Sequence, residues 1–238
     1  MRPQFLTWDV KGTLLRVCHS VGELYSSEAK LHGIQLEAKA LDRAFQAALQ
    51  MQEKFLPNYG RGRGLSSHQW WIDVVKKTFC LCGVSDERVL SPLAMNLYRQ
   101  FCSAGNWQVF GDVKDTLIHC RNLGISMAVI SNFDCRLEQI LANCNLRQYF
   151  KFVLTSEDVG AAKPDQRIFN AALSLAQVEP NQAVHIGDDV WMDYLAARAI
   201  GMESYLICRG QEEPSGAKGL VPKAHILHSL QQLCVLIK

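Results

Sequence analysis

Short apolar runs alternate with patterns of helical spacing over much of the chain. The apolar runs cover residues 5–8, 127–130, 152–154 and 183–186, with a weaker run at residues 204–207. The helical patterns cover residues 112–123, 136–144, 166–176 and 192–200. Strands that alternate with helices of this length predict βαβ units, and therefore an α/β fold built on a parallel sheet.

The stretch between the first two apolar runs has a different pattern, because residues 18–106 contain no convincing strand. Helical spacing there covers residues 21–32, 36–55, 69–80 and 92–102. Within the second segment, the stripe of an amphipathic helix is formed by Leu41, Phe45, Ala48 and Leu49. We therefore predict an all-helical domain at residues 17–106, inserted into a discontinuous α/β core formed by residues 1–16 and 107–238.

The composition indicates a folded chain and argues against several kinds of partner. Hydrophobic residues make up 48% and charged residues 20% of the 238 positions, which is too apolar for a disordered chain. The formal net charge of +2 gives no electrostatic basis for nucleic-acid binding. No run approaches the roughly 18–20 apolar residues that cross a bilayer, and the start lacks the apolar segment of a secretory signal. We expect an intracellular, cytoplasmic protein with neither nucleic-acid nor membrane partners, and the sequence leaves its oligomeric state open.

The cysteines and histidines do not form a recognisable metal-binding pattern. The 9 cysteines and 7 histidines are scattered, and Cys80 and Cys82 have no second ligand pair at zinc spacing. Most of the thiols are therefore expected to be small buried hydrophobic groups.

Four segments at the carboxyl ends of predicted strands carry groups suited to catalysis. In chain order these are Asp9, Lys11 and Thr13 after the first strand, Ser131 and Asn132 at the second, Lys163 after the third, and Asp188, Asp189 and Asp193 after the fourth. Open α/β sheets place their active sites at this edge, so we expect the side chains to converge. Each segment alone is a weak signal, whereas the four in this order are a strong one.

The acids among these residues suit a nucleophile and a metal site. A carboxylate such as that of Asp9 can attack phosphorus or an activated carbon and is regenerated through the covalent intermediate. Asp188 and Asp189 would place hard oxygen ligands beside Asp9, which suits Mg²⁺ better than any softer metal. The sequence therefore predicts a Mg²⁺ site next to a carboxylate nucleophile.

The remaining groups suit the stabilisation of negative charge. The Ser131 hydroxyl, the Asn132 amide and the backbone amides of residues 11–13 can donate hydrogen bonds to an oxyanion. Lys163 supplies a compact positive charge, and Asp193 could hold it in place. A nucleophile, metal ligands, donors and a cation are together the parts of a phosphoryl-transfer site.

At these residues the chain resembles the haloacid dehalogenase-like hydrolase superfamily, and its helical insertion resembles that of members with a small helical cap. The resemblance covers essentially the whole chain. It implies a Rossmann-like core, a mobile cap over the site, and a Mg²⁺-dependent phosphatase that acts on a small phosphorylated substrate through an aspartyl-phosphate. It also implies roles for individual residues: Asp9 as nucleophile, Ser131 as second-motif hydroxyl, Lys163 as third-motif lysine, Asp188 as metal ligand and Asp193 as the later acid of the fourth motif.

Position 11 departs from the family pattern. Phosphatases of the superfamily resemble DxDxT, in which the second Asp is the general acid and base, and this chain has Lys11 instead. The backbone carbonyl at this position usually binds the metal, so the resemblance still implies Lys11 as a ligand. General acid–base catalysis is worth roughly 10²–10⁴-fold, and a lysine with an ordinary pKa of ~10.4 is a poor acid at neutral pH. An ammonium held close to Asp9 would also neutralise the nucleophile.

Three interpretations follow from this departure. In the first, the protein is a phosphatase with a substitute acid, or one whose leaving group needs no protonation. In the second, it is a metal-independent dehalogenase-type hydrolase, because that branch resembles DxYGT; the acids Asp188 and Asp189 argue against it. In the third, it is a non-catalytic protein that binds a ligand or a partner.

Overall fold

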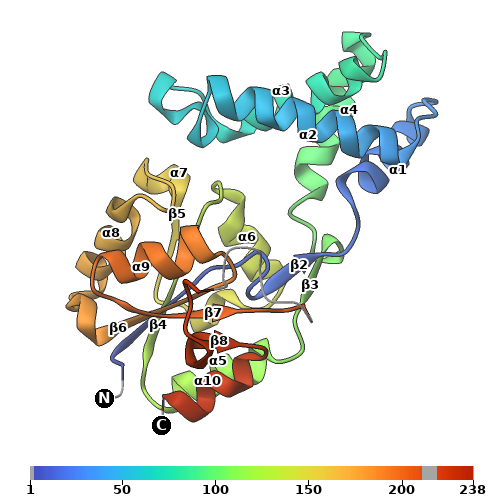
Figure 1. Cartoon of the computed structure of the whole chain (residues 1–238). Helices are drawn as coiled ribbons and strands as arrows, with labels where there is room; N and C mark the ends of the chain where they lie inside the picture. The colour runs from blue at the N-terminus through green and yellow to red at the C-terminus, as the bar shows by residue number, and fades with distance from the viewer. Residues whose placement is uncertain (1–2, 211–218, 238) are drawn as a thin grey trace. The chain divides into compact units, whose positions relative to one another are not determined.

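The computed structural model describes residues 3–210 and 219–237 (Figure 1). By its internal contacts the chain divides into two compact units. The first contains residues 1–16 and 108–238, and the second contains residues 17–107.

The first unit is built on a parallel sheet that has six strands within the described residues. The order across the sheet is β5 (Val153–Thr155), β4 (Ser126–Ser131), β1 (Phe5–Trp8), β6 (Ala183–Gly187), β7 (Glu203–Ile207) and β8 (Ile226–Leu227). The central strand β1 is buried along its whole length, as expected for a parallel strand covered on both faces. The predicted α/β fold with a Rossmann-like core is therefore confirmed.

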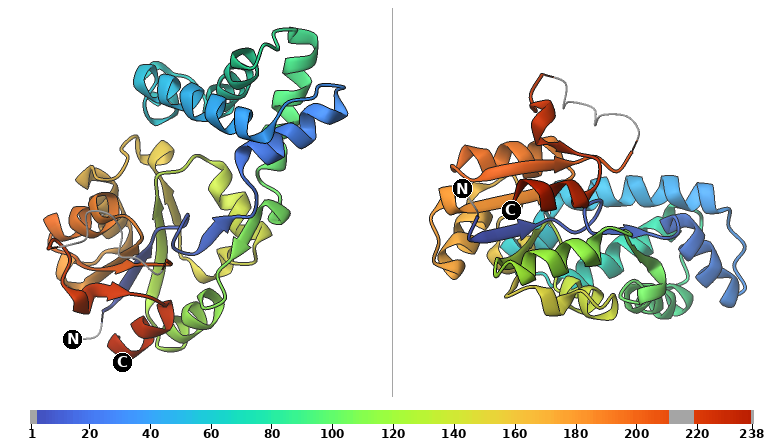
Figure 2. Two further views of the ribbon diagram at one scale, coloured as in Figure 1. Left: turned by 45° about the vertical axis from the view of Figure 1, so that its right-hand side comes forward. Right: turned by 90° about the horizontal axis from the view of Figure 1, so that it is seen from below.

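Helices cover both faces of this sheet. On one face lie α5 (Val113–Asn122) and α6 (Arg136–Asn143), and on the other lie α8 (Gln166–Ala176) and α9 (Ala196–Ala199) (Figure 2). This distribution follows from right-handed crossovers, because the chain moves outward from β1 in one direction to β4 and β5, and in the other to β6 and β7. The described part of this unit also contains α7 (Ser156–Val159) and α10 (Leu230–Leu236).

The second unit is helical and has its own hydrophobic core. Its helices are α1 (Val21–Leu31), α2 (Ala38–Phe55), α3 (Ser67–Leu81) and α4 (Glu87–Gln100). Their apolar faces meet in a buried cluster that includes Leu41, Phe45, Trp70 and Phe79. Glu28 is also buried here, where it accepts hydrogen bonds from the side chains of Asn96 and Gln100.

Several segments differ from the predicted elements. The last helix of the second unit begins at Glu87, before the predicted start at residue 92, because Asp86 caps it by accepting a hydrogen bond from Arg88 N. Residues 192–200 are not one α-helix, since a π-helical turn at Val190–Leu195 precedes α9. The chain also forms β2 (Leu15–Val17) and β3 (Trp107–Val109), two short strands that pair with each other and were not predicted.

Among the helices that the structure describes, none combines the length and apolar character needed to span a bilayer.

Candidate active site

Asp9 directly follows β1 and is held from two sides. Its backbone N–H donates to Ile186 O at 2.9 Å, which extends the pairing of β1 with β6 by one residue. Its Oδ1 accepts hydrogen bonds from Ser131 Oγ at 3.0 Å and from Lys163 Nζ at 2.6 Å. Burial raises the pKa of the Asp9 carboxyl above its ordinary value, although the charge of Lys163 opposes this. The result is a fixed carboxylate with few solvent contacts.

Lys163 lies between two carboxylates. Besides Asp9, its ammonium binds Asp193 Oδ1 at 2.5 Å and Ile130 O at 3.1 Å, and the side chain is buried. Burial acts to lower the pKa of Lys163, but the negative charges of Asp193 and Asp9 raise it above its ordinary value. Lys163 is therefore a permanent cation in this site.

Asn132 directly follows β4, as predicted, and its side chain contacts the backbone of Lys163. Its side-chain Nδ2 donates to Lys163 O at 2.9 Å, and its Oδ1 accepts from Lys163 N at 2.7 Å. The amide group thus clamps the backbone of Lys163 and fixes the point from which the lysine side chain extends. One amide hydrogen of Asn132 is committed to Lys163 O, and donation from this amide to an oxyanion stays a prediction.

Asp188 approaches the first strand end from β6. Its Oδ1 accepts a hydrogen bond from Thr13 Oγ1 at 3.3 Å. Burial, together with the negative charges of Asp9 and Asp193, raises the pKa of Asp188 to about 7. Three carboxylates, those of Asp9, Asp188 and Asp193, have oxygens within 4.8 Å of one another.

Two glycines make this close approach possible. Gly12 has φ +86°, and a Cβ built on it would lie 2.1 Å from Asp188 Oδ2. A Cβ on Gly187 would lie 2.2 Å from Asp193 Cγ. Both positions therefore require glycine for the acids to reach the site, and Gly12 also requires it for its left-handed backbone.

Asp189 does not join the cluster of acids. Its side chain is the N-cap of the π-helical turn, where Oδ1 accepts hydrogen bonds from Trp191 N and Met192 N, both at 2.8 Å. Its backbone N–H donates to Asp193 Oδ2 at 3.1 Å. Asp189 is therefore a helix cap whose backbone N–H orients Asp193, and its assignment as a metal ligand stays a prediction.

The turn after Asp9 also differs from expectation. Gly12 N donates to Leu15 O, and Thr13 N donates to Val10 O, so these two amides serve the turn and not an oxyanion. The Lys11 side chain is exposed, and the cation bound to Asp9 is Lys163. This arrangement does not support the idea of a neutralised pair between Asp9 and Lys11.

Arg209 supports this turn and was not found from the sequence. Its Nη2 donates to Thr13 O, and its Nη1 binds both carboxylate oxygens of Asp112 at 2.7 Å. Its guanidinium also stacks over the ring of Phe110. A lone arginine after a strand carries no sequence signal for such a contact, because its partners are distant in the chain.

The charges of the site fit a divalent cation. The three clustered carboxylates carry one compensating ammonium, that of Lys163, so a fully ionised site has an excess of two negative charges. Carboxylate oxygens are hard ligands of the kind that Mg²⁺ prefers. Both oxygens of Asp193 already accept hydrogen bonds, from Lys163, His185 and Asp189 N. Asp9 and Asp188 are therefore the side chains best placed to hold a metal.

The raised pKa of Asp188 leads to a prediction for metal-free protein. A carboxyl whose folded-state pKa exceeds its unfolded value lowers stability as pH rises, here between about 4 and 7. Solvent screens the charge of this partly buried side chain, so the effect on the free energy of unfolding is modest. We expect Asp188→Asn to be more stable than the wild type by about 1–2 kcal/mol at pH 8, with a much smaller gain in stability at pH 5. Urea unfolding with a chelator present tests this. An equal gain at both pH values would contradict it.

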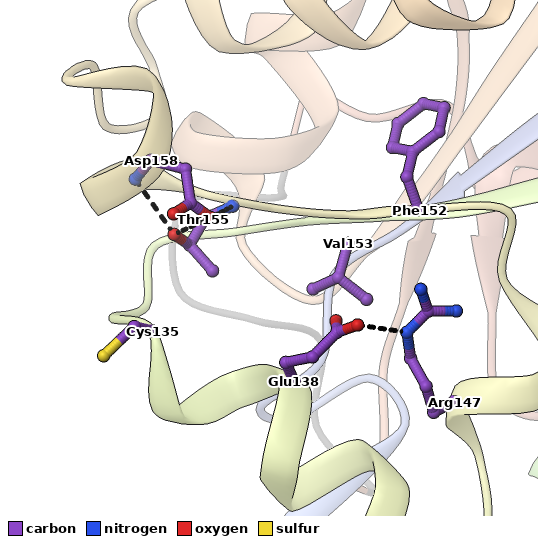
Figure 3. A pocket seen from close by; sticks show the side chains of 7 residues that line it. All are labelled: Cys135, Glu138, Arg147, Phe152, Val153, Thr155 and Asp158. Atoms are coloured by element: carbon purple, nitrogen blue, oxygen red, sulfur yellow. Dashed lines mark hydrogen bonds and ion pairs between the residues drawn. The ribbon is translucent and has the colours of Figure 1, made fainter.

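A separate pocket of about 330 Å³ lies beside the edge strand β5 (Figure 3). Two of its polar side chains, Glu138 and Arg147, bind each other at 2.6 Å, and Asp158 accepts from Thr155 Oγ1 at the same distance. None of the clustered acids lines it. We therefore place the chemistry at Asp9 and not in this pocket.

The fold and the site together define a class of protein: an α/β protein with a Rossmann-like core whose carboxylates converge at the carboxyl ends of the central strands. A family model described as haloacid dehalogenase-like hydrolase matches residues 5–201. The chain belongs to this family.

Relatives extend the match over nearly the full length. The chain is 50% identical to haloacid dehalogenase-like hydrolase domain-containing protein 3 of Bos taurus over 97% of this chain and 92% of that protein. Two solved structures share the fold. An HAD phosphatase from Thermococcus onnurineus has a TM-score of 0.69 at 21% identity, covering 100% of this chain and 98% of the other. A 2-haloacid dehalogenase from Pseudomonas syringae has a TM-score of 0.70 at 22% identity, covering 99% and 98%.

Proposed function

We propose that the protein is a phosphatase that hydrolyses a small phosphorylated molecule through an aspartyl-phosphate at Asp9. The observation that carries this proposal is the convergence on one buried carboxylate of a hydroxyl donor, Ser131, and a fixed cation, Lys163. These groups suit a reaction in which a carboxylate attacks a centre that carries negative charge.

The reaction has two steps. In the first, a carboxylate oxygen of Asp9 attacks phosphorus, the bond from phosphorus to the ester oxygen breaks, and the leaving oxygen takes up a proton from solvent water. In the second, water attacks the phosphorus of the acyl phosphate, the Asp9–phosphate bond breaks, and the Asp9 carboxylate and inorganic phosphate are released. Ser131 and Lys163 keep Asp9 oriented, and the charge of Lys163 offsets the negative charge that gathers around the phosphoryl group.

The site would hold Mg²⁺ through Asp9, Asp188 and the backbone carbonyl of Lys11. When bound, the ion would offset the charge of the phosphoryl oxygens. Asp188 would contribute an anionic ligand once it has lost its proton, and Thr13 would keep its carboxylate in place.

The direct test is hydrolysis of an aryl phosphate by the purified chain, with Mg²⁺ and with a chelator. An aryl leaving group needs little protonation, so this substrate suits a site that lacks the usual acid. Turnover that requires Mg²⁺ would support the proposal. A protein that neither turns over the substrate nor binds Mg²⁺ would instead be a binding protein that keeps the fold.

The residue at position 11 leads to a second prediction. If the missing acid limits the rate, Lys11→Asp should raise kcat/KM for an alkyl phosphate by about tenfold or more. The gain should be smaller for an aryl phosphate, whose leaving group needs less help. Initial rates on both substrates measure the difference. Because the Lys11 side chain is exposed, the substitution should leave the melting temperature nearly unchanged. Equal rates before and after the change would count against this explanation.

A metal-independent dehalogenase is a weaker candidate. A third carboxylate beside Asp9 and Asp193 adds a negative charge that such a reaction does not need, and it raises the pKa of Asp188 through repulsion as well as burial. Release of halide from a 2-haloacid in the presence of a chelator would favour this alternative over the phosphatase.

A further inference from the structure

His185 is a buried imidazole that the proposed reaction does not use. It lies within β6, opposite Thr7 of the neighbouring strand β1 in the register of the sheet. Its Nδ1 is 2.9 Å from Thr7 Oγ1, and its Nε2 is 3.1 Å from Asp193 Oδ1. The ring of Phe169 packs edge-on against the imidazole, with 5.1 Å between the centroids. The imidazole is therefore shielded from solvent and has a polar partner at each nitrogen.

For a neutral ring, one placement of protons satisfies both contacts. The Asp193 carboxylate can only accept, so Nε2 must carry the proton that points at it. In a neutral imidazole Nδ1 is then an acceptor, and the Thr7 hydroxyl donates to it. The same hydroxyl lies 3.4 Å from Val184 O, which is the longer of its two contacts. With the opposite tautomer, a bare Nε2 lone pair would face the carboxylate, which is repulsive.

The contacts of Asp193 continue from His185 to the nucleophile. Asp193 Oδ1 accepts from both His185 Nε2 and Lys163 Nζ, and Lys163 also binds Asp9. Without the hydrogen bond from His185, the Asp193 carboxylate could rotate away from Lys163. The Lys163 ammonium would then pair more fully with Asp9. A tighter ion pair makes Asp9 a weaker nucleophile, because its negative charge is more fully neutralised.

We propose that Thr7 and His185 form a hydrogen-bond relay that positions Asp193 and, through it, Lys163 for the reaction at Asp9. Thr7 and His185 are positioning residues in this relay, since neither contacts the carboxyl group of Asp9. Among the charged groups near the imidazole, Asp193 and Asp9 raise the pKa of His185, and Lys163 lowers it. Burial also lowers the pKa of His185, which favours the neutral form. The kinetic part of this proposal rests on the proposed function.

The first test does not depend on catalysis. In protein labelled with ¹⁵N-histidine, two-bond ¹H–¹⁵N spectra at pH 7.5 with a chelator report the tautomer, and the His185 signals are identified by their loss in His185→Gln. We expect a neutral ring with the proton on Nε2, and a shift of the Nδ1 signal in Thr7→Val. A proton on Nδ1, or a charged imidazolium, would overturn the relay.

The second test uses aryl phosphate hydrolysis. We expect His185→Leu to lower kcat about tenfold or more, with KM changed less than about threefold, because the lost group orients the catalytic apparatus without binding substrate. His185→Gln can offer an amide N–H toward Asp193, so it should recover much of the rate. Phe169→Leu is the packing control and should keep kcat within about twofold.

The results separate the two proposals. If His185→Gln, His185→Leu and Phe169→Leu lower kcat equally, His185 acts through packing alone and the relay is wrong. If the wild type hydrolyses no phosphate ester, the proposed function fails, and the tautomer measurement alone decides the relay.

Discussion

Replacing Asp9 with Asn is expected to lower phosphatase turnover by at least about 10³-fold while leaving the fold intact. An amide is not a competent nucleophile toward phosphorus, so the covalent intermediate cannot form. The substitution keeps the size of the side chain and an oxygen that can accept from Ser131 and Lys163. Initial rates on an aryl phosphate, with the melting temperature as a check on folding, measure the effect.

A matched variant makes this result specific. Asp115 is an exposed carboxylate in the first turn of α5 and is not one of the clustered acids, so Asp115→Asn should keep wild-type rates. Mass spectrometry of the Asp9→Asn protein excludes deamidation back to Asp as a source of residual rate. Turnover by intact Asp9→Asn within about tenfold of the wild type would show that Asp9 is not the nucleophile.

Replacing Lys163 with Met is expected to destabilise the protein by about 3–5 kcal/mol in metal-free buffer. The change removes the cation that Asp9 and Asp193 share and leaves two buried carboxylates without a counter-charge. For a chain of this length such a loss lowers the melting temperature by about 10 °C. Urea unfolding and thermal melts measure it directly.

The stability loss of the Lys163→Met variant should depend on pH, because the substitution raises carboxyl pKa values. Without Lys163, the pKa of Asp9 rises further above its ordinary value and the pKa of Asp193 rises with it, so the variant loses stability as pH increases through those values. The deficit relative to the wild type should therefore be larger at pH 8 than at pH 5. Arg167→Met is the matched control, because the Arg167 side chain is 70% exposed and its pair with Asp165 is worth about 0–1 kcal/mol. Equal losses in the two variants would contradict the assignment of Lys163 as a buried counter-charge.

The strands could be predicted from the sequence because the hydrophobic pattern that marks them is local. The predicted run at residues 5–8 coincides with β1, and the runs at residues 127–130 and 183–186 lie inside β4 and β6. A buried parallel strand needs apolar side chains on both faces, and such a run is visible without knowledge of its neighbours. The π-helical turn was not accessible in this way, because it depends on Asp189 capping two backbone amides.

Side-chain partners were harder to predict than side-chain positions. Asn132 and Asp189 stand at strand ends as expected, yet their oxygens bind backbone amides, and no sequence spacing distinguishes a cap or clamp from a ligand. His185 has the apolar neighbours of a packed strand residue, and only the register with β1 places Thr7 against one nitrogen. The direction of a side chain depends on such tertiary contacts.

The sequence by itself determined the family, the α/β class and the order in which the polar groups meet the ends of the strands. Those properties depend on local periodicity and on the rule that parallel strands bring their carboxyl ends to one edge. The tertiary structure alone decided which groups touch. Ser131 reaches Asp9 across 122 positions of sequence because β4 pairs with β1 in register, and Lys163 reaches it across 154 because Asn132, directly after β4, binds the Lys163 backbone. Hydrogen bonds depend on ångström distances, which only the packed sheet sets.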